Sequence, residues 1–148
     1  MITTYETSLQ LFIDGAWRAG EGRDQRPVFN PVSGDTLAGL PIATAADLDQ
    51  ALAAAESGWP VWRAKSADER AALMHRAAGL IRDRVEHIAT ILTMEQGKPI
   101  AEARGEVLSA AGLFDYFAEQ GKRIDGRIVP RPIGQRAMVL RQPVGPIG

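Results

Sequence analysis

The sequence contains no cysteine, and this absence removes several classes of chemistry at once. Without a thiol, these 148 residues can form no disulfide, no thiolate metal site and no cysteine nucleophile. A large charge imbalance is also missing, since the formal net charge is −1. The sequence therefore gives no electrostatic reason to expect nucleic acid or an anionic membrane surface as a partner.

Long apolar runs are absent as well, and no stretch approaches the roughly 18 apolar residues of a membrane span. The first residues, Met1 to Glu6, hold no basic segment followed by an apolar one. We therefore expect no export signal and a cytoplasmic protein. What is present, 45% apolar and 24% charged residues, is typical of a soluble globular chain.

Phosphate loops and metal-ligand pairs are missing too. Gly20-Glu21-Gly22 lacks the third glycine of a G-x-G-x-x-G loop, and a Walker loop at Gly97-Lys98 would need a glycine where Leu92 stands. The two histidines, His75 and His87, would lie about 120° apart on one helix, so they cannot share a metal. We expect both to be solvated or ordinarily hydrogen-bonded.

The first forty residues predict short strands and turns. A hairpin is expected at Leu11 to Arg18, because Asp14-Gly15 supplies the φ > 0 positions of a tight turn. Asn30-Pro31-Val32-Ser33-Gly34 predicts a second turn, which joins Val28-Phe29 to a returning strand at Leu37 to Ile42.

Three helices are predicted next. The first opens at a capping box of Thr44 and Asp47 and should stop at Ser57-Gly58. The second opens at Ser66 with Glu69 and continues unbroken until Gly97-Lys98-Pro99 ends it.

The third helix is expected from Ile100 to about Gln120, and its inner face is predicted as Val107, Ala111, Phe114 and Phe117. Gly105 and Gly112 lie inside it, where each costs roughly 1 kcal/mol against alanine. We therefore expect another segment to approach them closely. Two strands should follow, at Arg127-Ile128-Val129 and Ala137 to Arg141. The residues alone thus predict a strand–helix domain without an active site.

Several segments carry a family resemblance through their joint order and spacing. They are Leu11-Phe12-Ile13-Asp14-Gly15-Ala16-Trp17, Asn30-Pro31-Val32-Ser33-Gly34-Asp35, Ala46-Asp47-Leu48-Asp49-Gln50-Ala51, Met94-Glu95-Gln96-Gly97-Lys98-Pro99 and Arg141-Gln142-Pro143-Val144-Gly145-Pro146. In this order the chain resembles the N-terminal third of the aldehyde dehydrogenase superfamily. It is most similar to the succinate-semialdehyde and ketoglutarate-semialdehyde dehydrogenases.

The resemblance implies an α/β fold, the N-terminal part of the aldehyde dehydrogenase fold. Residues 1–125 would form the front of a Rossmann-like NAD(P)-binding domain, with short strands and three main helices. Residues 126–143 would form part of a β arm through which subunits associate as a homodimer or homotetramer. Residues 144–148 would begin a strand of the cofactor domain and are truncated.

The family's reaction starts with attack of a cysteine thiolate on the aldehyde. Hydride then passes to NAD or NADP, and a glutamate-activated water hydrolyses the thioester. Those groups occur later in family members. The resemblance therefore implies an oxidoreductase in the full-length protein, of which this chain is an N-terminal piece without catalytic or cofactor-binding residues, inactive alone.

Two contributions to sites are implied by the resemblance. Glu95, with the backbone carbonyls of Val28 or Phe29, would hold a monovalent cation through hard oxygen ligands, the alternative being a plain surface carboxylate. Gly105 and Ser109 would lie along the tunnel through which the aldehyde enters. Family members of the succinate-semialdehyde type often carry an aromatic residue in place of Ser109, so the substrate is not specified.

Two other functions fit the same residues. One is a non-enzymatic interaction module whose β arm exchanges with partner chains. The other is an acylating or phosphorylating member of the superfamily, which uses coenzyme A or phosphate in place of water.

Overall fold

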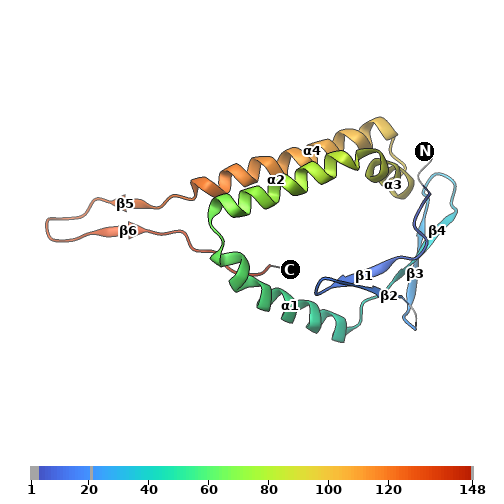
Figure 1. Ribbon diagram of the computed structural model, residues 1–148, viewed down its shortest axis with the longest axis horizontal. Helices are drawn as coiled ribbons and strands as arrows, with labels where there is room; N and C mark the ends of the chain where they lie inside the picture. The colour runs from blue at the N-terminus through green and yellow to red at the C-terminus, as the bar shows by residue number, and fades with distance from the viewer. Residues whose placement is uncertain (1–3, 21, 148) are drawn as a thin grey trace.

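A computed structural model describes residues 4–20 and 22–147 as an α/β chain of four helices, a 3₁₀ turn and six short strands (Figure 1). The helices are α1 (Ala45–Ala64), α2 (Ala67–Asp83), α3 (Val85–Gln96) and α4 (Ile100–Gln120), followed by a 3₁₀ turn, η1 (Gly121–Arg123). The strands are β1 (Gln10–Ile13), β2 (Ala16–Ala19), β3 (Gln25–Phe29), β4 (Thr36–Pro41), β5 (Arg127–Val129) and β6 (Ala137–Val139). They pair in chain order as antiparallel hairpins, β1–β2, β3–β4 and β5–β6.

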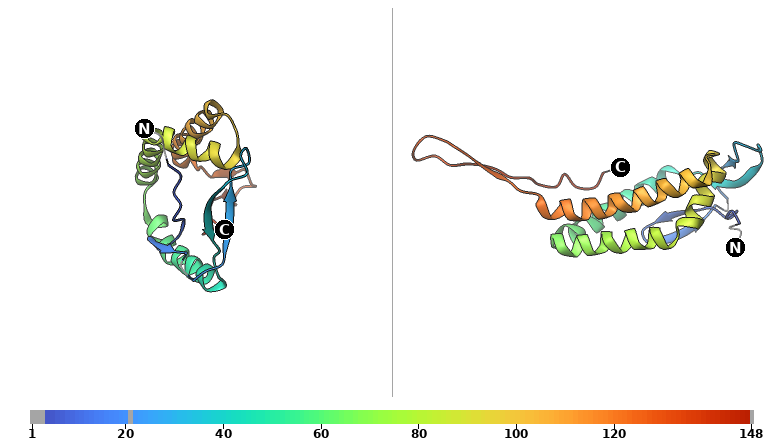
Figure 2. Two further views of the ribbon diagram at one scale, coloured as in Figure 1. Left: turned by 90° about the vertical axis from the view of Figure 1, so that its right-hand side faces the viewer. Right: turned by 90° about the horizontal axis from the view of Figure 1, so that it is seen from above.

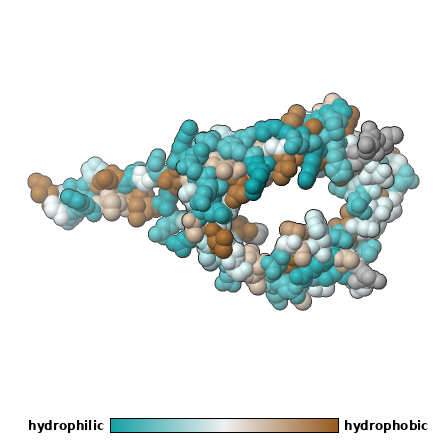
Figure 3. Space-filling view, viewed as in Figure 1, coloured by the Kyte–Doolittle hydropathy of each residue, from teal (hydrophilic) through white to brown (hydrophobic). Residues whose placement is uncertain are grey.

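The elements form an open ring with a projecting arm. α2 and α4 run side by side along one edge, α1 and the first hairpin form the opposite edge, and β5–β6 extends away from the ring (Figures 1 and 2). The space-filling view shows that side chains leave the centre of the ring open (Figure 3). Within the described residues, no helix combines the length and apolar character needed to cross a bilayer.

The first hairpin forms as its turn residues predict. Asp14 has φ 53° and Gly15 has φ 74°, the left-handed values that match the twist of a two-residue hairpin loop. The register places Phe12 opposite Trp17, with ring centroids 4.8 Å apart. Ile13, on the other face of β1, is buried.

The turn between β3 and β4 is also confirmed. The Asn30 side-chain oxygen accepts the backbone N–H of Val32 at 2.9 Å, and the Gly34 N–H donates to the Asn30 carbonyl at 2.8 Å. Gly34 takes φ 79°, as a tight return of the chain requires.

α1 is fastened to the strands at its first turn. The Thr44 hydroxyl accepts the backbone N–H of Asp47 at 3.2 Å, and the Asp47 carboxylate accepts the Thr44 N–H at 2.8 Å, which confirms the predicted capping box. Arg23 adds a two-pronged ion pair to the same carboxylate. Asp47 is only 4% exposed. Arg18 of β2 donates to Gln50 one turn further along α1.

The predicted end of this helix at Ser57-Gly58 is wrong, because α1 continues to Ala64 with Pro60 inside it. A proline within a helix removes the hydrogen bond that its own N–H would donate, and its ring crowds the carbonyl of residue i−4, at a cost of about 3 kcal/mol. The final turn is closed by the N–H of Lys65, which donates to the Trp62 carbonyl at 3.2 Å. The sequence pattern identifies the residues that weaken the helix, from Ser57 to Pro60, but does not show that the helix continues beyond them.

The single long helix predicted after Ser66 is also wrong, because it is broken at Arg84. This residue has φ −109° and ψ 15°, and it ends α2 and begins α3. The break turns α3 back, so that Ala89 packs in one cluster with Ala103 of α4. His75 and His87 consequently lie on separate helices, and their predicted angle about one axis does not apply.

The helical core is lined by small side chains. Its buried members are Ala71, Ala78, Ala89, Ala103, Val107, Ala111 and Ala118. Val107 and Ala111 therefore confirm half of the predicted inner face of α4. Phe114 and Phe117 do not belong to it, since they are 41% and 57% exposed. α4 packs along α2 through alanine side chains. The larger side chains of Phe114 and Phe117 lie beside this contact and stay exposed.

The two glycines inside α4 are not explained by packing within the chain. A Cβ atom built on Gly105 or Gly112 would meet nothing within 4 Å, so the predicted close approach is absent from the described residues. The opposite holds at Gly126, where a Cβ would lie 2.4 Å from the Val139 carbonyl oxygen. That glycine lets the base of the β5–β6 arm close.

The arm consists of β5 and β6 in antiparallel register, with Ile128 opposite Met138. Both strands were predicted, although β6 ends at Val139, before Arg141. Ile128, Met138 and Leu140 are largely exposed. The division of the chain into parts 1–125, 126–143 and 144–148 stays a prediction.

Candidate functional site

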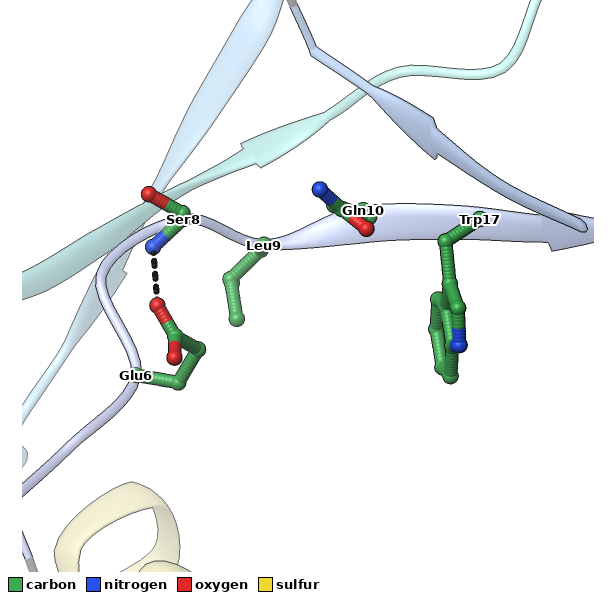
Figure 4. A pocket seen from close by; sticks show the side chains of 5 residues that line it. All are labelled: Glu6, Ser8, Leu9, Gln10 and Trp17. Atoms are coloured by element: carbon green, nitrogen blue, oxygen red, sulfur yellow. Dashed lines mark hydrogen bonds between the residues drawn. The ribbon is translucent and has the colours of Figure 1, made fainter.

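One hollow among the described residues lies beside the first hairpin. It measures about 430 Å³ and is lined by Glu6, Ser8, Leu9, Gln10 and Trp17. The side chains of Leu9 and Trp17 project to the same side of the hairpin (Figure 4). The Glu6 carboxylate is held by the backbone N–H of Ser8 at 2.8 Å. Leu9 and Trp17 give the hollow an apolar side, and Glu6, Ser8 and Gln10 give it a polar one.

A second hollow, of about 400 Å³, joins α1 to the end of the described chain. It is lined by Trp59, Trp62, Arg63, Arg70, Ile124 and Pro143. The Arg70 guanidinium donates to the backbone carbonyl of Lys65 and is thereby fixed at the junction of α1 and α2. The hollow lies where the chain returns from the arm to the ring, which indicates a structural role.

Glu95, the predicted cation ligand, lies near the end of α3 and accepts a hydrogen bond from the Tyr5 hydroxyl. Burial, followed by the bond to this carboxylate, raises the pKa of Tyr5 to about 12, so the phenol keeps its proton and donates. Gly97 ends α3 with φ 74°, and a Cβ atom built on it would lie 3.0 Å from the Pro31 ring and 3.3 Å from Val32. Gly97 therefore lies close beside the Asn-Pro turn, and the cation site at Glu95 stays a prediction.

Val28 and Phe29 lie at the end of β3, directly before that turn. Among the described residues, no three carboxylate, histidine or cysteine side chains gather closely enough to hold a metal. A cation here would therefore depend on backbone carbonyls beside a single carboxylate. Hard oxygen donors of that kind suit a weakly held monovalent ion.

Gly105 and Ser109, the predicted tunnel residues, share one exposed face of α4. At about 100° per residue, Gly112 and Tyr116 fall on the same face. The buried stripe of Ala103 and its neighbours lies on the opposite side of the helix. The two predicted residues are therefore available to contact something that the described residues do not include.

Sequence reasoning missed the charge cluster between α2 and α4. His75 lies between two carboxylates, with its Nδ1 2.6 Å from Asp115 and its Nε2 3.0 Å from Glu119. Arg82 pairs with Asp115, and Lys122 pairs with Glu119. The i, i+4 spacing of Asp115 and Glu119 was a visible signal, but the antiparallel neighbour that brings His75 to them was not.

Both ring nitrogens of His75 face acceptors, and an ionised carboxylate can only accept. The doubly protonated imidazolium alone satisfies both bonds. The bond to Asp115, and after it the bond to Glu119, raises the pKa of His75. The same bonds lower the pKa of each carboxyl group. These exposed ion pairs join α2 to α4. A His75 imidazolium held between two carboxylates is a poor general base.

Comparison with known proteins relates this chain to one family. A family model described as "Aldehyde dehydrogenase family" matches residues 17–148. The 3-sulfolactaldehyde dehydrogenase of Pseudomonas putida is 39% identical over 92% of this chain and 28% of its own length. The NADP(+)-dependent succinate-semialdehyde dehydrogenase of Escherichia coli is 38% identical, with the same shares covered.

The crystal structure of succinate-semialdehyde dehydrogenase from Burkholderia pseudomallei matches with a TM-score of 0.87 and 38% identity. The match covers 98% of this chain and 30% of that one. The chain thus spans less than a third of the length of the relatives that it matches, and its described shape is that of the corresponding part of a solved relative.

Protonated His75 should make the stability of the chain depend on pH. A group whose pKa is raised by folding stabilises fully below its ordinary value, here 6.5, and loses that contribution as the pH rises through the folded value. The urea midpoint should therefore fall between pH 6 and pH 9, and His75→Gln should flatten this dependence. His87→Gln, at an exposed position on α3, is the control and should keep it. An unchanged pH dependence in His75→Gln would show that the clamp contributes nothing.

Proposed function

We propose, because this chain belongs to the aldehyde dehydrogenase family, that it forms the first part of an NAD(P)-dependent enzyme that oxidises an aldehyde to the carboxylate. The observation that carries the proposal is the match to the solved relative, in which nearly the whole chain superposes on 30% of a longer polypeptide. A likeness of this extent at 38% identity supports a shared architecture and a shared chemistry.

The chemical groups of the reaction come from outside this chain. It contains no cysteine, so the thiolate that attacks the aldehyde must belong to the remaining polypeptide. NAD(P)+, when bound, supplies the hydride acceptor. The residues of this chain form scaffold around that chemistry. We place the protein in the cytoplasm, where these cofactors are supplied.

The substrate we propose is a short aldehyde that carries a second, anionic group. Relatives are named for succinate semialdehyde, glutarate semialdehyde and 3-sulfolactaldehyde. These compounds differ in length and in the anion, but each combines an aldehyde with a carboxylate or sulfonate. The exposed face of α4 with Gly105 and Ser109 would border the approach of this substrate, since small side chains there leave space beside the helix.

We further propose that the β5–β6 arm associates with other copies of the protein, as a homodimer or homotetramer. A two-stranded hairpin is marginally stable alone, and this one exposes Ile128, Met138 and Leu140. A strand edge with apolar side chains recruits another strand when one is available.

A monovalent cation held by Glu95 and the carbonyls of Val28 or Phe29 is the remaining part of the proposal. The close approach of Gly97 to Pro31 supports it, because Gly97 follows Glu95 by two residues and Pro31 follows Phe29 by two. The Tyr5 hydroxyl bonds one oxygen of Glu95 and leaves the other available.

The purified 148-residue chain should not oxidise aldehydes, because it lacks a thiolate nucleophile. Succinate semialdehyde with NAD+ or NADP+ should give no rise in absorbance at 340 nm, while the Escherichia coli relative, assayed in parallel, should give one. Cofactor reduction that scales with the concentration of the purified chain would refute the scaffold role.

The arm should make the chain self-associate. Light scattering after size exclusion should give a mass above that of the 16.0 kDa monomer, and the share of that species should rise with concentration. Met138→Lys, which places a charge on the exposed strand, should reduce it, whereas Arg136→Lys keeps the charge and should not. A wild-type chain that stays monomeric at high concentration would contradict self-association through the β5–β6 arm.

The cation should stabilise the chain selectively. Thermal unfolding in potassium chloride should occur at a higher temperature than in tetramethylammonium chloride at equal ionic strength, and Glu95→Gln should abolish the difference. Glu102→Gln, at an exposed position on α4, is the control. Equal unfolding temperatures in both salts for the wild-type chain would rule the site out.

A further inference from the structure

The β5–β6 arm differs in charge from the rest of the chain. Residues 126–143 contain four arginines, Arg127, Arg131, Arg136 and Arg141, and no acidic residue, whereas the whole chain has 17 basic and 18 acidic residues. All four side chains are exposed, and the arm projects away from the ring (Figure 1). The arm therefore presents a positive surface that attracts anions.

The pairing register gives the arm two unlike faces. Paired residues of an antiparallel hairpin share a face, and the next residue along each strand lies on the other face. Ile128 is paired with Met138, and both belong to the apolar side through which we expect copies of the chain to associate. Arg127 is paired with Val139 and lies on the opposite face. An apolar contact between copies leaves that face open.

A hollow of about 370 Å³ lies at the base of the arm and is lined by Asp125, Gly126, Arg127, Val139 and Arg141. Arg127 and Arg141 come from opposite sides of the hairpin, and Arg141 follows the pairing partner of Arg127 by two residues. Diagonal neighbours of this kind are about 7–8 Å apart, within reach of long side chains. Two guanidinium groups can therefore approach one ligand from two sides.

Gly126 keeps the base of the arm narrow. A Cβ atom at this position would overlap the Val139 carbonyl oxygen, so the two segments come this close because the residue is glycine. Arg127 follows Gly126 directly, and Arg141 follows Val139 by two residues. The close approach thus brings together the backbone segments that carry both arginines.

The arginines of the hollow lack the partners that other arginines have. Arg23 and Arg82 each pair with an aspartate. Within residues 4–20 and 22–147, no ion pair involves Arg127 or Arg141, although Asp125 lines the same hollow. Their N–H groups are available to an added oxyanion, which a guanidinium binds through two parallel hydrogen bonds.

We propose that this hollow binds inorganic phosphate. Arg127 and Arg141 donate to its oxygens from the two sides of the hairpin. Phosphate keeps at least one hydrogen at neutral pH, and the Asp125 carboxylate, which can only accept, takes a hydrogen bond from that hydroxyl. Sulfate has the same shape but no hydrogen, so the same carboxylate repels it. The inference does not depend on the proposed function.

Calorimetric titration of the purified chain at neutral pH tests the site. Sodium phosphate should bind saturably, and sodium sulfate should bind at least about tenfold more weakly, the loss expected for one charge-assisted hydrogen bond. A constant ionic strength keeps the screening of the arm equal in both titrations. Absence of saturable phosphate binding, or equal affinity for the two anions, overturns the proposal.

Matched substitutions in the arm make the test specific. Arg127→Gln and Arg141→Gln should each weaken phosphate binding at least about tenfold. Arg136→Gln removes the same charge outside the hollow, roughly 17 Å of extended chain from Arg141. It should change the affinity less than about twofold, because a charge at that distance is largely screened. Equal losses in all three variants would show general attraction to a basic arm and would overturn the site.

Asp125→Asn tests the choice between the two anions. An amide can donate to sulfate and accept from phosphate, so the variant should bind both with similar affinity. Preserved discrimination would remove Asp125 from the site and overturn phosphate as its ligand.

Folding of the variants is checked independently of binding. Circular dichroism and light scattering should match the wild-type chain, because the apolar side chains of the arm are unchanged. If a glutamine variant unfolds, Arg127→Lys replaces it. Lysine keeps the charge but not the two-pronged geometry, so phosphate binding should still weaken. Unchanged affinity in Arg127→Lys contradicts the proposed geometry.

Discussion

The shape of the molecule depends on the Asp47 carboxylate and the groups that hold it. Asp47 closes the capping box of α1 and receives the guanidinium of Arg23 from the strand region. The bond from Arg23, and after it those from Thr44, hold the pKa of Asp47 well below its usual range. A carboxylate so shielded from water persists as an ion only because every partner is present. One side chain thus starts α1 and joins it to the adjacent segment between β2 and β3.

Features that depend on a few neighbouring residues could be predicted from the sequence. The two capping boxes, the Asp14-Gly15 hairpin and the Asn30 turn are each determined by local hydrogen bonds and backbone preferences. Two predictions from local patterns were wrong. They are the end of the first helix at Ser57-Gly58 and the unbroken helix after Ser66. At Pro60 the helix continues despite a local cost, and at Arg84 it breaks without a signal in the apolar periodicity, so in both places local rules were insufficient.

The candidate site likewise has features that short motifs predict and features that only the folded structure shows. The order of short motifs was sufficient to indicate the family, and the proximity of the Glu95 run to the Asn-Pro turn follows from that family. The exposure of Phe114 and Phe117 could not be predicted from periodicity, because a helical stripe shows which residues share a face and not what covers it. His75 became significant only when the antiparallel packing of α2 on α4 placed two carboxylates beside it.

The open ring also has a consequence for biosynthesis. A ribosome that makes a protein of the relatives' size would produce this part first, with roughly 350 residues still to come, which at 5–20 residues per second takes about 20 to 70 s. During that time Trp17 and Leu52 stand in water beside other nascent chains. The hydrogen bonds of Asp47 and Glu95 would then hold the helices and strands of this first part together until the rest of the polypeptide is synthesised.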